Sequence, residues 1–158
     1  MESAYLWLKT LHILGVILFL GNIIITGWWK VMADRTQEPR IIAFAQRQVT
    51  LTDYVFTAGG IVLLLGAGLG NAHLHGISIP QNPWLLWGNA LFIASGLIWF
   101  ALLIPVQVRL ARLAAAFAAG GPIPGEYWRL CRVWNFWGLC ATLLPLSVLY
   151  FMVFKGPA

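Results

Sequence analysis

Four long apolar stretches, separated by short polar segments, dominate the pattern of residues along the chain. They cover about residues 5–29, 50–70, 84–104 and 132–154. A helix needs about 20 mostly apolar residues to cross the hydrocarbon core of a bilayer, and each stretch has that length. The pattern therefore predicts an all-α integral membrane protein, with a single four-helix transmembrane domain over residues 1–158.

Composition agrees with a membrane location. Hydrophobic residues make up 60% of the chain and charged residues 9%, and the mean hydropathy is +0.80. These values lie far from those of soluble domains, so a soluble core is excluded. The first stretch has no basic segment before it and ends at Trp28, Trp29 and Lys30 rather than at small residues. We expect it to be retained as a membrane helix rather than cleaved as a signal peptide.

Positive charges are distributed unevenly between the connections. They flank the first and third connections, whereas residues 71–83 contain no Lys or Arg. The positive-inside rule predicts that the first and third connections face the cytoplasm and that both termini lie outside. These flanks account for the net charge of +5. We interpret them as determinants of orientation in a bacterial inner membrane that attract anionic lipid, not as a nucleic-acid surface.

One stripe of the first stretch carries polar and small residues. His12, Gly15, Phe19, Asn22 and Thr26 fall within roughly 80° of one another on a helix. An ionisable residue in a membrane span is costly without a partner and marks a candidate functional site. Two interpretations of the histidine stay open. It is either a core residue hydrogen-bonded to a neighbouring helix or the axial ligand of a haem, with the asparagine in the same site.

The other histidines are expected at the same, outer end of the bundle. His73 and His75 follow the second stretch, and each is a candidate sixth ligand of a haem at His12 or part of a surface copper or zinc site. Merely solvated loop histidines are the simpler interpretation. The cytoplasmic half has no histidine, so at most one haem b is expected. Lys9 and Lys155, at the outer end, are the candidate partners of its propionates.

Two further residues are predicted to organise the helices. Asp53 opens the second stretch, and we expect it to pair with Arg47 or with an arginine of the third connection. Pro145 cannot donate a hydrogen bond to the carbonyl of Ala141. A kink, or a group bound to that carbonyl, is therefore predicted in the fourth stretch.

Glycine and cysteine spacing adds two weaker expectations. Gly66 and Gly70 form a GxxxG pattern, which is typical of a close-packing helix face. Cys131 and Cys140 are nine residues apart on one predicted helix, beyond the reach of a disulfide. We expect both cysteines to be packing residues.

Several segments carry a resemblance to known families. They are Leu8–Gly15, Gly27–Lys30, Ala33–Thr36, Asp53–Thr57 and Tyr150–Lys155. They resemble a bacterial family of predicted four-helix integral membrane proteins known as a domain of unknown function, over essentially the whole chain. Through the Leu-His of the first stretch the chain is more distantly similar to HemJ-type protoporphyrinogen oxidases and CopD membrane domains. That resemblance implies His12 as a haem ligand, but residues 27–30 depart from the HemJ pattern.

Together these observations lead to one functional hypothesis and its alternatives. The hypothesis is an inner-membrane protein that binds one haem b near the outer leaflet and serves in electron transfer, with quinol as a candidate donor. As an enzyme it would be a haem-dependent membrane oxidoreductase. A homodimer or a subunit of a membrane complex is expected. The alternatives are a haem-free structural or accessory subunit and a copper-related membrane protein.

Overall fold

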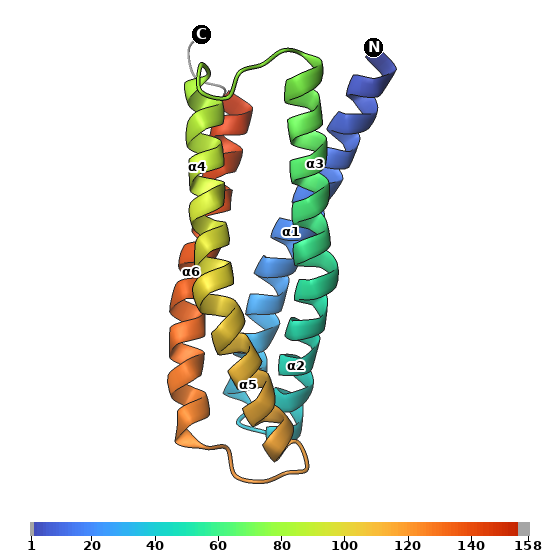
Figure 1. Ribbon diagram of the computed structural model, residues 1–158. Coiled ribbons are helices and arrows are strands. Elements are labelled where there is room, and N and C mark those ends of the chain that lie inside the picture. Colours follow the sequence, from blue (N-terminus) through green and yellow to red (C-terminus); the bar gives the residue numbers. More distant parts are fainter. Residues whose placement is uncertain (1, 155–158) are drawn as a thin grey trace.

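The structure is a computed structural model that describes residues 2–154, and Lys155 lies outside the described residues. No strand occurs among residues 2–154, and the helices form four long rods (Figure 1). All four rods are long and apolar enough to cross a membrane, which confirms the predicted all-α membrane fold. In chain order the elements are α1 (Glu2–Arg35), α2 (Pro39–Thr52), η1 (Asp53–Ala58), α3 (Gly59–Leu74), α4 (Pro83–Ile98), η2 (Trp99–Leu103), α5 (Ile104–Phe117) and α6 (Gly125–Phe154).

The rods are longer than the predicted spans, and most of the added length lies at one end. The second rod runs from Pro39 to Leu74 through α2, η1 and α3, and the third from Pro83 to Phe117 through α4, η2 and α5. At the arginine-rich end every rod extends roughly two to four turns past its apolar stretch. The third ends at Phe117, and Gly120, three residues further, adopts a φ of +101°.

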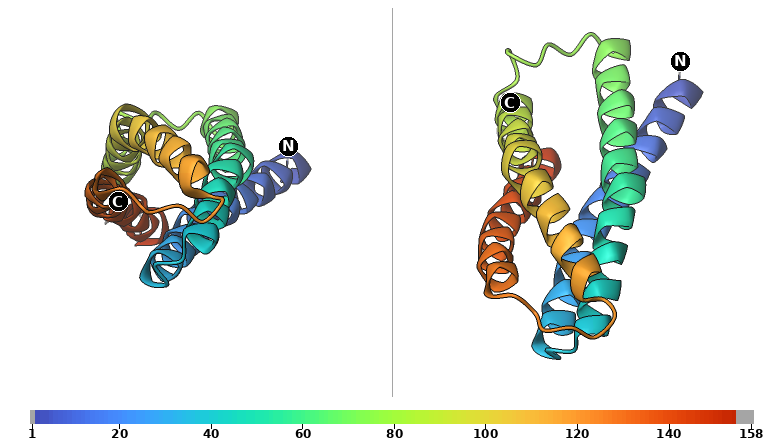
Figure 2. Two further views of the ribbon diagram at one scale, coloured as in Figure 1. Left: turned by 90° about the horizontal axis from the view of Figure 1, so that it is seen from below. Right: turned by 60° about the horizontal axis from the view of Figure 1, so that its bottom comes forward.

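The rods are arranged as two pairs, α1 with α3 and α4 with α6 (Figures 1 and 2). The pairs stay apart toward the termini, where a ring contact between Phe19 and Phe92, with centroids 5.6 Å apart, links them. They close at the arginine-rich end, where α2 packs against α5 and the larger core cluster lies. That cluster includes Ile42, Leu110 and Tyr127, each fully buried. The bundle is therefore tightest at its arginine-rich end.

Glycines bring α1 and α3 into backbone contact. A Cβ built on Gly15 would lie 2.5 Å from the backbone nitrogen of Leu64, and one built on Gly60 would lie 2.8 Å from that of Phe19. Both distances are shorter than real Cβ atoms tolerate. Only glycine fits at these two positions, because the obstructing atoms belong to the opposing backbone rather than to flexible side chains.

Within this single chain, only the second glycine of the expected GxxxG face contacts another helix. A Cβ on Gly66 would meet nothing within 4 Å, whereas one on Gly70 would touch only the side chain of Leu8. The close contact with α1 instead uses Gly60 and Gly68, which lie eight residues apart on the same helix and both face α1. Helix rotation, which the spacing of glycines does not specify, decided between the two faces.

The prediction about Pro145 is confirmed in its main point. The hydroxyl of Ser95 on α4 donates a hydrogen bond of 2.6 Å to the carbonyl oxygen of Ala141 on α6. This is the carbonyl that the proline ring leaves without its helical donor. A side chain of the neighbouring rod therefore occupies the freed acceptor and ties α4 to α6.

The glycine contact gives a stability prediction with a matched control. Gly60→Ala should lower the free energy of unfolding by about 1–3 kcal/mol, because the new methyl group must push the α1 backbone away. Gly66→Ala, in the same helix but facing open space, should be neutral or slightly stabilising, since alanine favours helix. Thermal unfolding in detergent, followed by circular dichroism, measures both. Equal melting temperatures for the two variants would contradict the described helix contact.

Candidate functional site

The carboxylate of Asp53 is the centre of a buried polar network. Its Oδ1 accepts hydrogen bonds from Asn22 Nδ2 at 3.2 Å and from Thr57 Oγ1 at 2.9 Å. Its Oδ2 accepts one from Gln107 Nε2 at 2.9 Å. The expected arginine partner is therefore wrong: these donors are all neutral. Arg47 lies on a different face of the same rod and is exposed.

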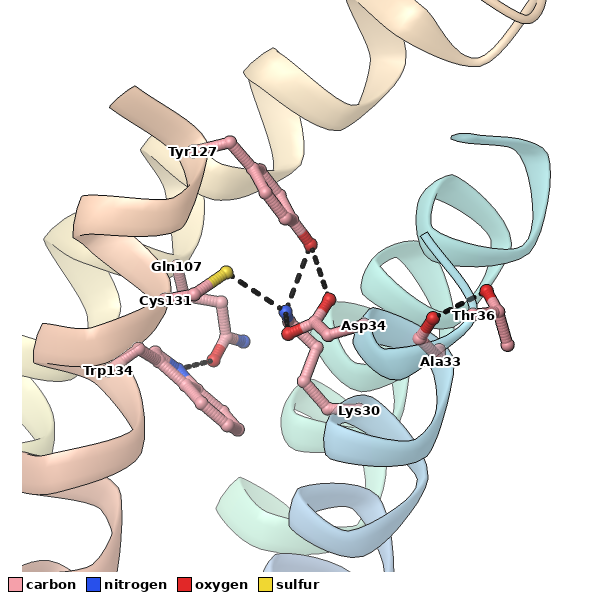
Figure 3. A network of polar contacts seen from close by, with 8 residues as sticks. All are labelled: Lys30, Ala33, Asp34, Thr36, Gln107, Tyr127, Cys131 and Trp134. Atoms are coloured by element: carbon pink, nitrogen blue, oxygen red, sulfur yellow. Dashed lines mark hydrogen bonds and ion pairs between the residues drawn. The ribbon is translucent and has the colours of Figure 1, made fainter. Parts of the chain in front are cut away.

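The network joins all four rods. Asn22 also donates to the hydroxyl of Thr57, at 2.9 Å, and the indole nitrogen of Trp134 on α6 donates to Gln107 Oε1 at 3.1 Å, a bond drawn in Figure 3. Asn22 thus lies in this network rather than beside His12, from which it is separated by ten residues, or roughly 15 Å of helix. A polar cluster shared by four helices fixes their relative rotation, because a turn of any one of them would leave buried groups unpaired.

Two π-helical segments lie at this level of the bundle. η1 carries Asp53 and Thr57, and η2 carries Trp99 and Leu103. Wide turns of this kind are often found at functional sites. The second has an evident cause: Pro105, two residues after its end, has no amide proton to donate to the turn before it. The hydrophobic pattern contains no signal for either segment.

A cavity of about 460 Å³ opens beside the network. Its polar lining includes Asp53, Thr57, Ser95 and Gln107, all buried. Its rim includes Ile24, Leu139 and Leu143, which are about half exposed and lie on α1 and α6. The indole rings of Trp99 and Trp134 complete the lining. An apolar cavity with a few convergent polar groups is the usual form of a small-molecule site.

A second buried cluster, which the sequence reasoning missed, lies nearer the arginine-rich end (Figure 3). Lys30 is fully buried, and its ammonium donates to Asp34 Oδ2 at 2.6 Å, to the hydroxyl of Tyr127 at 2.9 Å and to the sulfur of Cys131 at 3.3 Å. The hydroxyl of Tyr127 in turn donates to Asp34 Oδ1 at 3.1 Å. All three ammonium protons are used, so this cluster is a clamp between α1 and α6. The four-residue spacing of Lys30 and Asp34 was the available signal.

Both cysteines are free, in agreement with the expected lack of a disulfide between them. Cys131 nevertheless does more than fill space, because its sulfur accepts the hydrogen bond from Lys30. Cys140 is half-buried on the same helix.

His12 contacts α3 through its ring. Its Nδ1 lies 2.7 Å from the carbonyl oxygen of Leu64, and because a carbonyl can only accept, Nδ1 carries the proton. The ring lies over Gly68, where a Cβ would come within 2.9 Å of Nδ1. The core interpretation of this histidine is thereby supported, and Nε2 is the nitrogen left with a lone pair.

The remaining haem candidates do not gather around His12. Lys9 is exposed and lies over the ring of Tyr5, 5.6 Å from its centroid. His75 packs edge-on against the same ring, with centroids 5.0 Å apart, and its Nδ1 lies 3.0 Å from the carbonyl oxygen of Asn71. Neither of the two described cavities is lined by His12.

The second-ligand hypothesis requires His73 or His75 to approach His12. Tyr5, the partner of His75, is seven residues from His12, or roughly 10 Å of helix. Two imidazoles on one metal must bring their nitrogens to within about 4 Å, two metal–ligand bonds of about 2 Å each. His73 is exposed, and no group of three potential metal ligands occurs within residues 2–154. The described structure thus gives the surface copper or zinc site no support.

Comparison with known proteins identifies the family. The family described as "Predicted integral membrane protein (DUF2269)" matches residues 6–156. The chain belongs to the DUF2269 family. No curated protein and no solved structure matches it, so the resemblance to HemJ-type and CopD proteins gains no support. For this DUF2269 protein, function is inferred from the site itself.

Removal of the central carboxylate tests the network. Asp53→Asn should lower the free energy of unfolding of the DUF2269 protein by about 1–3 kcal/mol, because an amide offers one acceptor oxygen where three donors converge. The loss is measured as a lower melting temperature in detergent. Arg47→Gln should leave it unchanged, since Arg47 takes no part in the network. A loss of stability in Arg47→Gln matching that in Asp53→Asn would restore the ion-pair interpretation.

Proposed function

We propose that this membrane protein binds a lipid-soluble small molecule of the quinone type in the cavity beside Asp53. The observation that supports this proposal is a buried carboxylate at the start of the second apolar stretch, held by neutral donors on the wall of an apolar cavity of about 460 Å³. A buried ionisable group in a membrane helix is costly and marks a functional site. A quinol would serve as the electron donor considered above for a redox role.

The unused hydrogen-bonding capacity suits a quinol or quinone head group. A carboxylate has about four lone-pair sites, and Asp53 uses three of them. One acceptor site is left for a ligand hydroxyl. Gln107 uses one of its two amide protons on Asp53, so one donor is left for a ligand carbonyl. The reduced and oxidised forms of such a ring present these two groups.

The shape of the cavity fits the rest of such a molecule. Its mouth is framed by exposed apolar side chains on α1 and α6, among them Leu139 and Leu143, which would face hydrocarbon in a bilayer. An apolar tail can therefore remain in the lipid while the ring enters. Trp99 and Trp134 provide flat surfaces against which an aromatic ring packs favourably.

A cavity-filling variant tests the proposal. Gly138 lines the cavity, and a Cβ there meets nothing within 4 Å, so Gly138→Leu should fill the cavity without disturbing the helices. A short-chain quinone analogue should raise the melting temperature of the wild-type protein and of the control Gly66→Leu. It should not raise that of Gly138→Leu, because ligand binding stabilises only a protein that can bind.

An alkane that matches the tail of the quinone analogue but lacks its ring provides the baseline for nonspecific effects of the additive on the melting temperature. An equal shift of the melting temperature in all three proteins, or a shift reproduced by the alkane, would refute the quinone site.

Haem binding at His12 is the second candidate, and one observation favours it. The hydrogen bond from Nδ1 to the carbonyl of Leu64 fixes the ring and leaves Nε2 as the free nitrogen, as in many metal-ligating histidines. Lys9 and Asn22 do not converge on this ring, so the structure supports a quinone site better than a haem site. Phe19, at the nearer end of the cavity, is seven residues from His12, or roughly 10 Å.

A spectrum decides the haem candidate. Protein purified from cells supplied with a haem precursor should show a Soret band, and His12→Ala should lose it while His73→Ala retains it. A wild-type protein without a Soret band would eliminate haem and favour a haem-free accessory role. It would leave the quinone test unaffected, because that test requires no cofactor.

We further propose a bacterial inner-membrane location, with the arginine-rich end in the cytoplasm and the termini outside. The charge asymmetry supports this orientation, and the helical extensions beyond the bilayer lie at the same end. Assembly as a homodimer or complex subunit stays a prediction from the sequence.

A further inference from the structure

A groove between α5 and the start of α6 lies apart from the cavity described above. Its volume is about 590 Å³, and it lies at the arginine-rich end of the bundle. The lining consists of Pro105, Val108, Arg109, Arg112, Leu113 and Glu126. We propose that this groove binds the headgroup phosphate of an anionic phospholipid.

The charges in the groove leave one cation for a ligand. Arg109 forms an ion pair with Glu126, whereas Arg112 forms no ion pair among residues 2–154. The two arginines are three residues apart on α5 and so lie on the same face of that helix. Arg109 is largely exposed, with 65% of its side chain accessible, so its guanidinium has further donors available. The groove therefore carries a net positive charge and favours an anion.

The depth of the groove matches the phosphate layer of a bilayer. The third apolar stretch ends near Ile104, and Arg109 lies five residues further, or roughly 7.5 Å along the helix. The headgroup layer on each side of the hydrocarbon core is about 5–8 Å thick. The guanidinium groups therefore lie at the level where lipid phosphates are found.

The apolar part of the lining selects a lipid over a free anion. Pro105 and Val108 also line the groove, and each lies four residues, or about one turn, closer to the hydrocarbon than Arg109 and Arg112 respectively. An acyl chain that extends from a phosphate in the groove toward the hydrocarbon would run along these residues. Basic pockets beside cytoplasmic helix ends bind anionic headgroups in this way.

Native mass spectrometry of the purified full chain with added phosphatidylglycerol tests the site. The double variant Arg109→Gln/Arg112→Gln should bind the lipid about 25-fold more weakly, since each cation near a membrane anion contributes a factor of about five. The control Arg40→Gln/Arg47→Gln removes the same charge from exposed positions on α2 and should change the affinity less than twofold. The single variant Arg112→Gln, which breaks no ion pair, should show about a fivefold loss.

Glu126→Gln gives an effect of opposite sign. Loss of this competing carboxylate frees Arg109 and should tighten phosphatidylglycerol binding several-fold, which a merely structural ion pair would not do. Equal affinity for phosphatidylcholine, an unchanged affinity in the double variant, or a loss matched by the α2 control would overturn the proposal. Displacement of the lipid by millimolar inorganic phosphate would assign the groove to soluble anions and would also overturn it.

Discussion

A polar group buried in a membrane is costly unless it finds a partner within the protein, and the arrangement of the four rods around Asp53 follows from that constraint. The carboxylate of Asp53 is satisfied by donors from three rods, and Trp134 adds the fourth through Gln107. Rotation of any rod would leave buried donors or acceptors without partners. The same constraint explains why Ser95 covers the carbonyl that Pro145 exposes.

The two ends of the bundle are held by different forces. At the arginine-rich end the buried Lys30 cluster and a large apolar cluster close the four rods around one another. Toward the termini the rods separate into two pairs, and the α1–α3 pair is joined by backbone contact at Gly15 and Gly60. The cavity lies between these two ends, at the level where the rods have begun to diverge but still share polar groups. A site at this level is both walled by polar side chains and open toward lipid.

The wide helical turns belong to the same level. η1 places Asp53 and Thr57 on the inner face, and η2 sets Trp99 against the cavity. An extra residue in a helical turn rotates all that follows it, so these segments decide which side chains line the site. His12 contacts α3 and does not line the cavity, which separates a haem hypothesis physically from the cavity.

The sequence by itself determined the fold class, the four membrane rods and the freed acceptor near Pro145. These features depend on local properties: the length of an apolar run and the missing amide proton of proline. The partners of Asp53, the choice of Gly60 over Gly66, and the burial of Lys30 were decided only by the tertiary structure. Each depends on the rotation of one helix against another, which apolar residues on all sides of a membrane helix do not specify. The cavity was likewise decided by the tertiary structure, because residues from all four rods surround it.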